Sequence, residues 1–369
     1  MKTTQRYLAL DVLRGMTVAM MILVNNPGSW AHIYAPLEHS KWHGCTPTDL
    51  VFPFFLFVVG VSMFFSFLKY GNTLNKESLV RVGRRTLLIY AVGFFLASFP
   101  QWITDYSKLR ILGVLPRIAL AYGIGSIIVL AFNRKYLPYI GGAILLGYWA
   151  ILYFFGGSDP YSLQGNATNS IDSAILGVNH MYKGFGIPFD PEGLLSTIPA
   201  VVTVIIGYLI GSMIKETDKS KVYKKLLMAG FVGIISGLIW GIVFPINKPL
   251  WTSSYVLYAA GWACIVLAIL IWVIDVKGHS KWTSFFLVFG MNPLFIFALS
   301  GLWAKALWQM VHISMPDGSI QSGSGWLYSQ VFQPLAGDIN GSLLYAISHV
   351  LLFWLIGYVL YKKKIFIKV

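Results

Sequence analysis

Residues 49–69, DLVFPFFLFVVGVSMFFSFLK, carry one charge at each end and none between them. A helix that crosses a bilayer needs about 20 mainly apolar residues, so this segment points to a membrane. Similar apolar runs recur along the chain, at about 7–28, 85–103, 111–132, 136–155, 194–214, 226–246, 253–274, 283–304 and 342–361. The sequence therefore predicts an all-α fold, a polytopic transmembrane helical bundle of about ten spans in a single domain, residues 1–369.

The composition agrees with lipid as the main solvent. Of the 369 residues, 56% are hydrophobic and only 11% are charged, against about 25% charged residues in soluble proteins. The aromatic content of 16% suits Trp- and Tyr-rich belts at the two membrane surfaces. A net charge of +14 would suggest nucleic acid in a soluble protein; here no nucleic-acid partner is expected, because the charge follows the membrane topology. The two cysteines, Cys45 and Cys264, exclude a disulfide framework or a cysteine-rich metal site.

Basic residues divide unequally between the two faces that the predicted spans define. With the N-terminus inside, 20 of the 28 Lys and Arg residues fall in inner segments and five in outer ones, as the positive-inside rule predicts. The inner residues are Lys2, Arg6, Lys69, Lys76, Arg81, Arg84, Arg85, Arg134, Lys135, Lys215, Lys219, Lys221, Lys224, Lys225, Lys277, Lys281, Lys362, Lys363, Lys364 and Lys368. The outer residues are Lys41, Lys108, Lys183, Lys248 and Lys305. Both termini are therefore predicted to be cytosolic.

The longer connections, at 29–48, 156–193 and 305–341, all fall on the predicted outer face. Long loops on one face usually carry the specificity of a site. The first of them ends in EHSKWHGCTPTD, which sets two histidines and several charges against the apolar run that follows. This stretch is the main candidate for a functional site.

Three interpretations of this stretch are open. Asp49, with the threonines before it, can be an ordinary helix N-terminal cap. His39 and His43 can be surface loop residues, or both can bind a metal with Glu38 or Asp49, although nothing elsewhere in the sequence completes a metal pattern. No metal is therefore predicted.

The combination of residue types favours the third interpretation, a catalytic site. A histidine at the membrane surface, with a carboxylate brought close by the next helix, is suited to act as a general base whose tautomer the carboxylate fixes. His39 and Asp49 are these candidates. Asn25 and Asn26, at the outer end of the first span, are uncharged donors on the same side that could hold an oxyanion or a substrate hydroxyl.

Other polar residues stand in apolar surroundings. Asp11 and Arg14 share one helix face and can pair, either as a structural ion pair or at an inner cavity. Arg117 has no carboxylate in its own span, so it needs a partner from another helix or an anionic ligand. Asp190 in FDPEG is predicted to cap the next helix, and His180 is either a polar loop residue or a substrate contact.

Taken together, the site stretch and its surroundings resemble the catalytic membrane domain of the heparan-α-glucosaminide N-acetyltransferase family. The matching blocks are EHSKWHGCTPTDLVFPFFLFVVG, LDVLRGMTVAMMILVNNPG, RILGVLPRIALAY, FDPEGLLSTIPAVV, FPINKPLWTSSYVL, VIDVKG, FGMNPL and YKKKIFIKV. They cover nearly the whole chain in the order that the family has. The N-terminal lumenal portion and the additional span of the lysosomal members are not among them, so the chain resembles the bare catalytic domain of bacterial relatives.

The resemblance implies transfer of an acetyl group from cytosolic acetyl-CoA to the amine of a terminal glucosamine on the far side of the membrane. The essential histidine of the family motif His-x-x-Trp-x-Gly corresponds to His39, with Trp42 as its tryptophan. Asp49 and Asn25 stand at the matching aspartate and asparagine, whereas no role carries over to His43. The stretch NPGSWAHIY and the central outer loop differ from the lysosomal members, so the acceptor stays open.

Acetyl-CoA is the expected cosubstrate, and its phosphates are expected at the basic inner face. Its predicted contacts are Arg84, Arg85, Arg117, Lys362 and Lys363. The predicted contacts to the amino-sugar acceptor are Asn26, Trp42 and His180. The expected location is a bacterial inner membrane with the site facing the periplasm, in contact with lipid and with a homodimer as an open possibility.

Two mechanisms are open for His39. It deprotonates the acceptor ammonium for direct attack on the thioester, which is the preferred course, or it first takes the acetyl group itself. Two other functions fit the composition: an O-acetyltransferase that acts on a surface glycan, and a transporter of a glycan or lipid intermediate.

Overall fold

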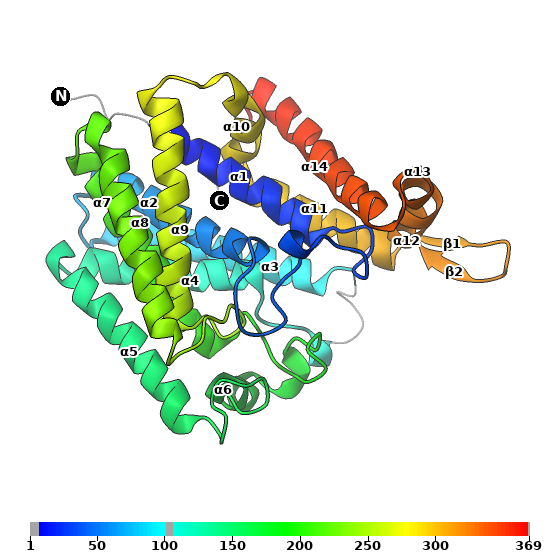
Figure 1. Cartoon of the computed structure of the whole chain (residues 1–369), viewed down its shortest axis with the longest axis horizontal. Helices are drawn as coiled ribbons and strands as arrows, with labels where there is room; N and C mark the ends of the chain where they lie inside the picture. The colour runs from blue at the N-terminus through cyan, green and yellow to red at the C-terminus, as the bar shows by residue number, and fades with distance from the viewer. Residues whose placement is uncertain (1–6, 101–105, 368–369) are drawn as a thin grey trace.

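The computed structural model describes residues 7–100 and 106–367, which fold into a bundle of long helices (Figure 1). Lys2, Arg6, Lys368 and the end of the predicted span 85–103 lie outside the described residues. The helices are α1 Leu8–Asn25, α2 Val51–Phe67, α3 Lys76–Ser98, α4 Val114–Ala131, α5 Leu137–Phe155, α6 Ala167–Leu176, α7 Leu194–Glu216, α8 Lys219–Gly241, α9 Ser253–Leu270, α10 Ser284–Met291, α11 Pro293–Gln309, α12 Gly323–Leu327, α13 Gln333–Ala336 and α14 Asp338–Lys362. The predicted all-α class is confirmed.

The described residues contain one pair of strands, β1 His312–Ser314 and β2 Ile320–Ser322. The two strands pair antiparallel, and the hairpin projects from the bundle beside α12 and α13 (Figure 1). Two strands of three residues each are too short to form a stable sheet on their own. The hairpin is therefore a loop extension of the helical bundle.

The predicted spans match long helices throughout the described chain. Eight helices are long and apolar enough to cross a membrane, and the pair α10–α11, bent by 73°, makes a ninth if it is one span. The remaining predicted span corresponds to α3, a helix of 23 residues. Its N-terminal half carries Lys76, Arg81, Arg84 and Arg85, so only its second half is as apolar as the other spans.

Proline explains the bend between α10 and α11. The residue before a proline is disfavoured in the helical conformation, and Asn292 before Pro293 has φ −131° and ψ 51°. Its side-chain amide binds the chain beyond α14, donating to Ile365 O at 3.0 Å and accepting from Ile367 N at 2.8 Å. Asn26 before Pro27 has nearly the same backbone angles and ends α1. The two Asn-Pro dipeptides therefore break the backbone in the same way.

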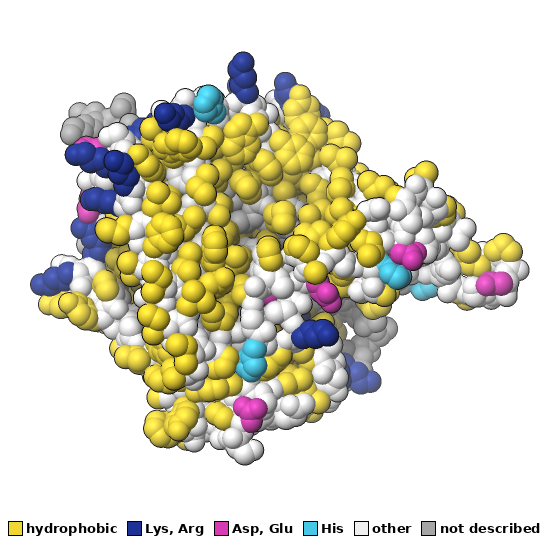
Figure 2. Space-filling model, viewed as in Figure 1, with side chains coloured by type: hydrophobic (Ala, Val, Ile, Leu, Met, Phe, Trp, Pro, Cys, Tyr) yellow, Lys and Arg dark blue, Asp and Glu magenta, His cyan; other side chains and the backbone are white. Residues whose placement is uncertain are grey.

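Charge separates the bundle into two ends. Lys and Arg side chains gather at the upper left and top of the view, with a wide hydrophobic surface below them (Figure 2). We call this the basic end, defined by Arg84, Arg134, Lys225 and Lys362. The opposite end is formed by the long connections, and we call it the loop end. The hydrophobic side chains exposed between the two ends, such as Ile242 at 81%, are those expected to face lipid.

The centre of the bundle is a close contact between α2 and α7. Small residues let membrane helices approach closely, and van der Waals packing then supplies the stabilisation. At Gly60 an added Cβ would lie 2.1 Å from the carbonyl oxygen of Val204, and at Gly207 it would lie 2.2 Å from that of Phe57. Both obstacles are backbone atoms, so neither helix can relieve the clash by a change of rotamer.

Substitution of Gly207 by valine is therefore expected to destabilise the protein. Overpacking costs about 1–3 kcal/mol, and here α2 and α7 must separate as whole helices. The expected result is a lower thermal unfolding temperature and less monodisperse protein in detergent. Gly147→Val on α5 is the control, because an added Cβ there meets nothing within 4 Å; equal behaviour of the two variants would contradict the packing argument.

Candidate active site

A cavity of about 280 Å³ opens at the loop end of the bundle, where segments far apart in the sequence meet. The first loop and the start of α2 supply one wall, and the connections before α4, α7 and α9 supply the others. The side chains that line the cavity are His39, Ser40, Asp49, Arg110, Tyr182, Phe185, Pro191, Glu192, Lys248, Pro249 and Trp251. The cavity thus combines titratable groups with three aromatic rings.

His39 and Asp49 form a pair in this cavity. The distance from His39 Nδ1 to Asp49 Oδ1 is 2.7 Å. Because a carboxylate accepts hydrogen bonds and cannot donate them, Nδ1 carries a proton in this pair, and Nε2 is the ring nitrogen that can exchange a proton with a substrate. The His39 side chain is 43% exposed and that of Asp49 only 1%. The imidazole can therefore meet a substrate while its partner stays fixed.

Backbone and side-chain donors of the same loop hold the Asp49 carboxylate. Oδ2 accepts from Ser40 N and Thr46 N, each at 3.0 Å, and from Thr46 Oγ1 at 3.2 Å. Asp49 lies in a 3₁₀ turn at Thr48–Leu50, before α2 begins. The residue at the N-cap of α2, Leu50, makes no side-chain cap bond, so the predicted helix-capping role of Asp49 is wrong, and its carboxylate instead ties the loop to the turn.

Lys248 lies beside the His39–Asp49 pair. Its Nζ lies 3.4 Å from Asp49 Oδ1, 3.1 Å from His39 Nδ1 and 3.5 Å from Nε2. The side chain is 17% exposed. Burial lowers the pKa of Lys248 from its ordinary value, and the Asp49 charge opposes that shift. The Lys248 ammonium is thus within reach of both the imidazole and the carboxylate.

The turn that carries Lys248 is held on both sides. The buried side chain of Asn247 accepts from Leu250 N at 2.7 Å and donates to Trp42 O at 2.9 Å. Trp251 has a φ of +52°, which is rare for a bulky residue. Strain of this kind persists only where the surroundings fix the backbone, often at functional sites. The connection between α8 and α9 is therefore locked to the first loop.

An ion-pair network forms the opposite wall. Arg110 binds Asp190 through two bonds, Nε to Oδ2 at 2.8 Å and Nη2 to Oδ1 at 2.6 Å. Nη2 also lies 2.5 Å from Glu192 Oε2. Burial disfavours the charged guanidinium, but the two carboxylates outweigh it, and the pKa of Arg110 is raised. The guanidinium lies over the Tyr182 ring, 4.9 Å from its centre, so this wall is rigid.

The N-terminus of α7 is capped from another helix. Its N-cap residue is Gly193, which has no side chain, and Asp172 of α6 accepts from Leu195 N at 3.0 Å instead. A Cβ at Gly193 would lie 1.8 Å from Asp172 Oδ2, so glycine leaves the room that this carboxylate needs. Asp190 binds Arg110 and the backbone N–H of Glu192. The predicted capping role of Asp190 is therefore wrong.

Asp172 makes stability depend on pH. Burial raises the pKa of Asp172 to about 6 from the model-peptide value of 3.8. The folded state thus binds the proton more tightly than the unfolded state, and the contribution of Asp172 to stability falls as pH rises from about 4 to 6, by about 3 kcal/mol. In Asp172→Asn we expect this part of the slope to disappear in thermal unfolding measured from pH 4 to 7. An unchanged slope would contradict the assignment.

Arg117 lies behind the cavity and is fully buried. Its Nη2 donates to Gly193 O at 3.2 Å and to Ser196 Oγ, and its guanidinium carbon lies 5.0 Å from the centre of the Trp251 ring. Nε and Nη1 have no hydrogen-bond partner among the described residues. The helix that supplies a partner for Arg117 is therefore α7. Binding of the cosubstrate by Arg117 stays a prediction.

The other predicted site residues on the outer side do not line the cavity. Asn25 is exposed at the end of α1, and Asn26 is buried and donates to Ile22 O at 2.7 Å. Trp42 donates to Tyr161 O at 2.8 Å and packs on Phe185 and Phe189. His180 Nδ1 lies 2.8 Å from Leu109 O. The contacts of the last three residues position loops. The catalytic role predicted for Asn25 as an oxyanion donor and the substrate contacts predicted for the other three stay predictions.

Apart from Arg117, the residues predicted for phosphate binding lie at the basic end, and three of them line two separate grooves. Arg84 and Arg85 line one groove on α3, where Arg85 also lies over the Tyr122 ring at 4.6 Å. Lys362 lines the other, and Lys363 is not among the lining residues of either. Asp11 and Arg14 form the expected ion pair, at 3.3 Å. Among the described residues no cluster of His, Cys, Asp and Glu could hold a metal.

Lys248, Arg110 and Glu192 are the site residues that the sequence did not single out. Lys248 was visible as one of few basic residues on the outer face, but its place beside His39 depends on a contact across 209 positions of the chain. Glu192 and Arg110 were visible only as charges near the ends of spans. All three are charged residues that lie away from the basic end. The positive-inside rule does not explain a charge in this position, so each such residue is a candidate for a role in a site.

Fold and site define a class: a polytopic helical membrane protein with a His–Asp pair and a lysine in a cavity at its loop end. The model of the family described as heparan-alpha-glucosaminide N-acetyltransferase, catalytic, matches residues 6–240. The chain belongs to this family, which confirms the resemblance read from the sequence.

Two curated relatives carry the name heparan-alpha-glucosaminide N-acetyltransferase. The mouse protein is 27% identical over 429 aligned residues, which cover 100% of this chain and 61% of the mouse protein. The human protein is 26% identical over 351 residues, 79% of this chain and 52% of the human protein. The chain thus spans little more than half the length of these relatives.

Proposed function

We propose that the protein transfers an acetyl group from acetyl-CoA to the amine of a terminal glucosamine or a related amino sugar. The observation that carries the proposal is the His39–Asp49 pair in the cavity at the loop end, with Lys248 beside it. The names of the two relatives supply the substrate class. The expected reaction needs a base, a carboxylate that orients the base and a cation for the oxyanion, and His39, Asp49 and Lys248 are suited to these three roles.

His39 acts as the base in the course that we favour. Nε2 removes a proton from the acceptor ammonium, while Asp49 holds the Nδ1–H side of the ring. The amine attacks the thioester carbon and a C–N bond forms. Lys248 stabilises the oxyanion on the former carbonyl oxygen. When the C–S bond breaks, the imidazolium returns its proton to the leaving sulfur. The nitrogen, which keeps an excess proton after the attack, releases it to solvent, so the products are the amide, the CoA thiol and one H⁺.

The walls of the cavity suit a sugar acceptor. Glu192 keeps a partly exposed carboxylate beside the cavity, with a side chain 13% exposed, and it is suited to bind an ammonium or hydroxyl group. Tyr182, Phe185 and Trp251 offer apolar ring surface for the C–H face of the sugar. We assign to Glu192 the orientation of the acceptor, because its contact with Arg110 fixes the carboxylate in the cavity wall.

The donor approaches from the other side of the membrane in this proposal. The basic end carries the charge that the positive-inside rule assigns to the cytosol, so we place the loop end and its site on the extracytoplasmic face. The phosphates of acetyl-CoA then stay at the basic end, where Arg84, Arg85, Lys362 and Lys363 are the candidates. The pantetheine arm brings the thioester to His39 between the helices.

An acetyl-transfer assay tests the function. Purified protein in nanodiscs is incubated with radiolabelled acetyl-CoA and glucosamine, and the products are separated and counted. The expected result is N-acetylglucosamine and free CoA in equal amounts. Label on a hydroxyl group of an N-blocked sugar would assign O-acetylation instead. Uptake of the sugar into vesicles with no consumption of acetyl-CoA would assign transport and overturn the proposal.

A further inference from the structure

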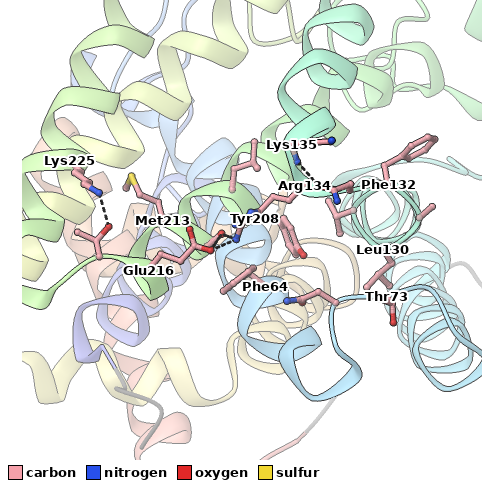
Figure 3. A pocket seen from close by; sticks show the side chains of 17 residues that line it. Phe64, Thr73, Leu130, Phe132, Arg134, Lys135, Tyr208, Met213, Glu216 and Lys225 are labelled. Atoms are coloured by element: carbon pink, nitrogen blue, oxygen red, sulfur yellow. Dashed lines mark hydrogen bonds and ion pairs between the residues drawn. The ribbon is translucent and has the colours of Figure 1, made fainter. Parts of the chain in front are cut away.

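A second cavity, of about 790 Å³, lies at the basic end of the bundle, away from the residues of the active site. It is bounded by the last turns of α4 and α7, the start of α5 and the first turns of α8 (Figure 3). We call it the basic-end groove and define it by Asn72, Arg134, Lys135, Glu216 and Lys225. None of these residues has a part in the acetyl-transfer chemistry above.

The charges of the groove are unbalanced. Three cations, Arg134, Lys135 and Lys225, line it together with a single carboxylate, Glu216. Arg134 Nη1 pairs with Glu216 and also binds Ser212 Oγ (Figure 3). This pair neutralises one cation and fixes the guanidinium in place.

The two lysines remain available to a ligand. Lys225 Nζ donates to Thr217 Oγ1 at 3.2 Å, and Lys135 Nζ lies 4.8 Å from the centre of the Tyr136 ring. Neither contact supplies a negative charge. Two positive charges therefore stay uncompensated by the residues that line this groove, a surplus that favours an anion.

The shape and remaining donors of the groove narrow the choice of anion. Its floor is apolar, with the buried rings of Phe64 and Tyr208, and hydroxyl groups such as that of Thr73 stand at its rim (Figure 3). Within the described part of the chain, the buried Oδ1 of Asn72 has no hydrogen-bond partner. The two ends of an amide exchange places by a flip, so Asn72 can present its NH₂ group to an anion. The volume lies within the range of small-molecule sites, about 300–1,000 Å³.

We propose that the basic-end groove binds a phosphate-bearing anion at the membrane surface. The Arg134 guanidinium offers a planar set of N–H donors to phosphate oxygens, and Lys135 and Lys225 add point charges from either side. The same chemistry is available from an anionic phospholipid headgroup in the adjacent leaflet and from a soluble phosphate ester. The groove is lined by other residues than those to which we assign the phosphates of acetyl-CoA, so the proposal stands without the proposed acetyl transfer.

Thermal unfolding in nanodiscs tests the proposal with two probes. The reference is protein in phosphatidylcholine alone. One arm adds phosphatidylglycerol to the bilayer, and the other adds inorganic pyrophosphate to the buffer. Binding to the folded state alone raises the unfolding temperature, here by about 2–4 °C for moderate saturation. The response in one arm or the other identifies the source of the phosphate.

Matched variants separate the groove from general surface charge. Lys135→Gln/Lys225→Gln keeps the Arg134–Glu216 pair, so the variant is expected to fold and to lose the rise in unfolding temperature. Lys221→Gln, an exposed lysine on α8 paired with Asp218 at 3.9 Å, is expected to keep it. No rise with either probe in the wild type, or an equal loss in Lys221→Gln, overturns the proposal.

Discussion

Alanine at position 39 is expected to lower the rate of acetyl transfer by about 10²–10⁴-fold, the contribution of a positioned general base. His39 is the one imidazole among the residues that line the active-site cavity, and its bond to Asp49 leaves Nε2 free to accept a proton. The loss is expected mainly in kcat, because the walls that bind the acceptor remain. The measurement is the radiolabel assay at saturating acceptor and acetyl-CoA.

Two further variants make this prediction specific. Asp49→Asn keeps the volume of the side chain but removes the charge, so the tautomer of His39 is no longer fixed, and we expect a loss of about 10-fold or more. His312→Ala on the exposed hairpin is the control and is expected to keep wild-type activity. Full activity in His39→Ala would show that the site assignment is wrong. A burst of acetylated enzyme before steady turnover would replace direct transfer by the acetyl-histidine course.

The sequence predicts the bundle well because two independent signals agree. Apolar runs give the spans, and basic residues give the direction in which each span crosses. The boundaries are less secure where a helix leaves the lipid. α8 begins at Lys219, several residues before the apolar run that starts near 226, because the basic residues at its start are helical but not apolar. The same mixture makes α3 the weakest of the predicted spans.

Only part of the site can be predicted from the sequence, because most of its residues lie far apart along the chain. His39 and Asp49 lie ten positions apart around one loop, so residue types alone suggest the pair. Lys248, Arg110 and Glu192 come from three other connections, and no local pattern shows that these connections meet. Trp42 carries the family motif, yet its indole N–H binds Tyr161 O. A motif residue can thus hold the loops of a site together without facing the cavity.

Methionine in place of Lys248 is expected to lower kcat by about 10²–10³-fold, the effect of losing one oxyanion donor. The variant also leaves Asp49, with a side chain only 1% exposed, without the cation 3.4 Å from it. Lys41→Met, an exposed lysine of the same end, is the control and is expected to keep its activity. Activity within threefold of wild type in Lys248→Met would show that the cation has no part in catalysis.

The pH profile distinguishes a catalytic cation from a structural one. Burial lowers the pKa of Lys248, so it loses its proton at a lower pH than an ordinary lysine, whose pKa is 10.5. Activity that needs the ammonium is present below this pKa and falls as pH rises through it. Lys248→Arg keeps the charge at all accessible pH values, so its alkaline limb is expected to move to higher pH. If Lys248 had only a structural role, the alkaline limb would have the same position in wild type and in Lys248→Arg, because other groups would then cause the loss of activity at high pH.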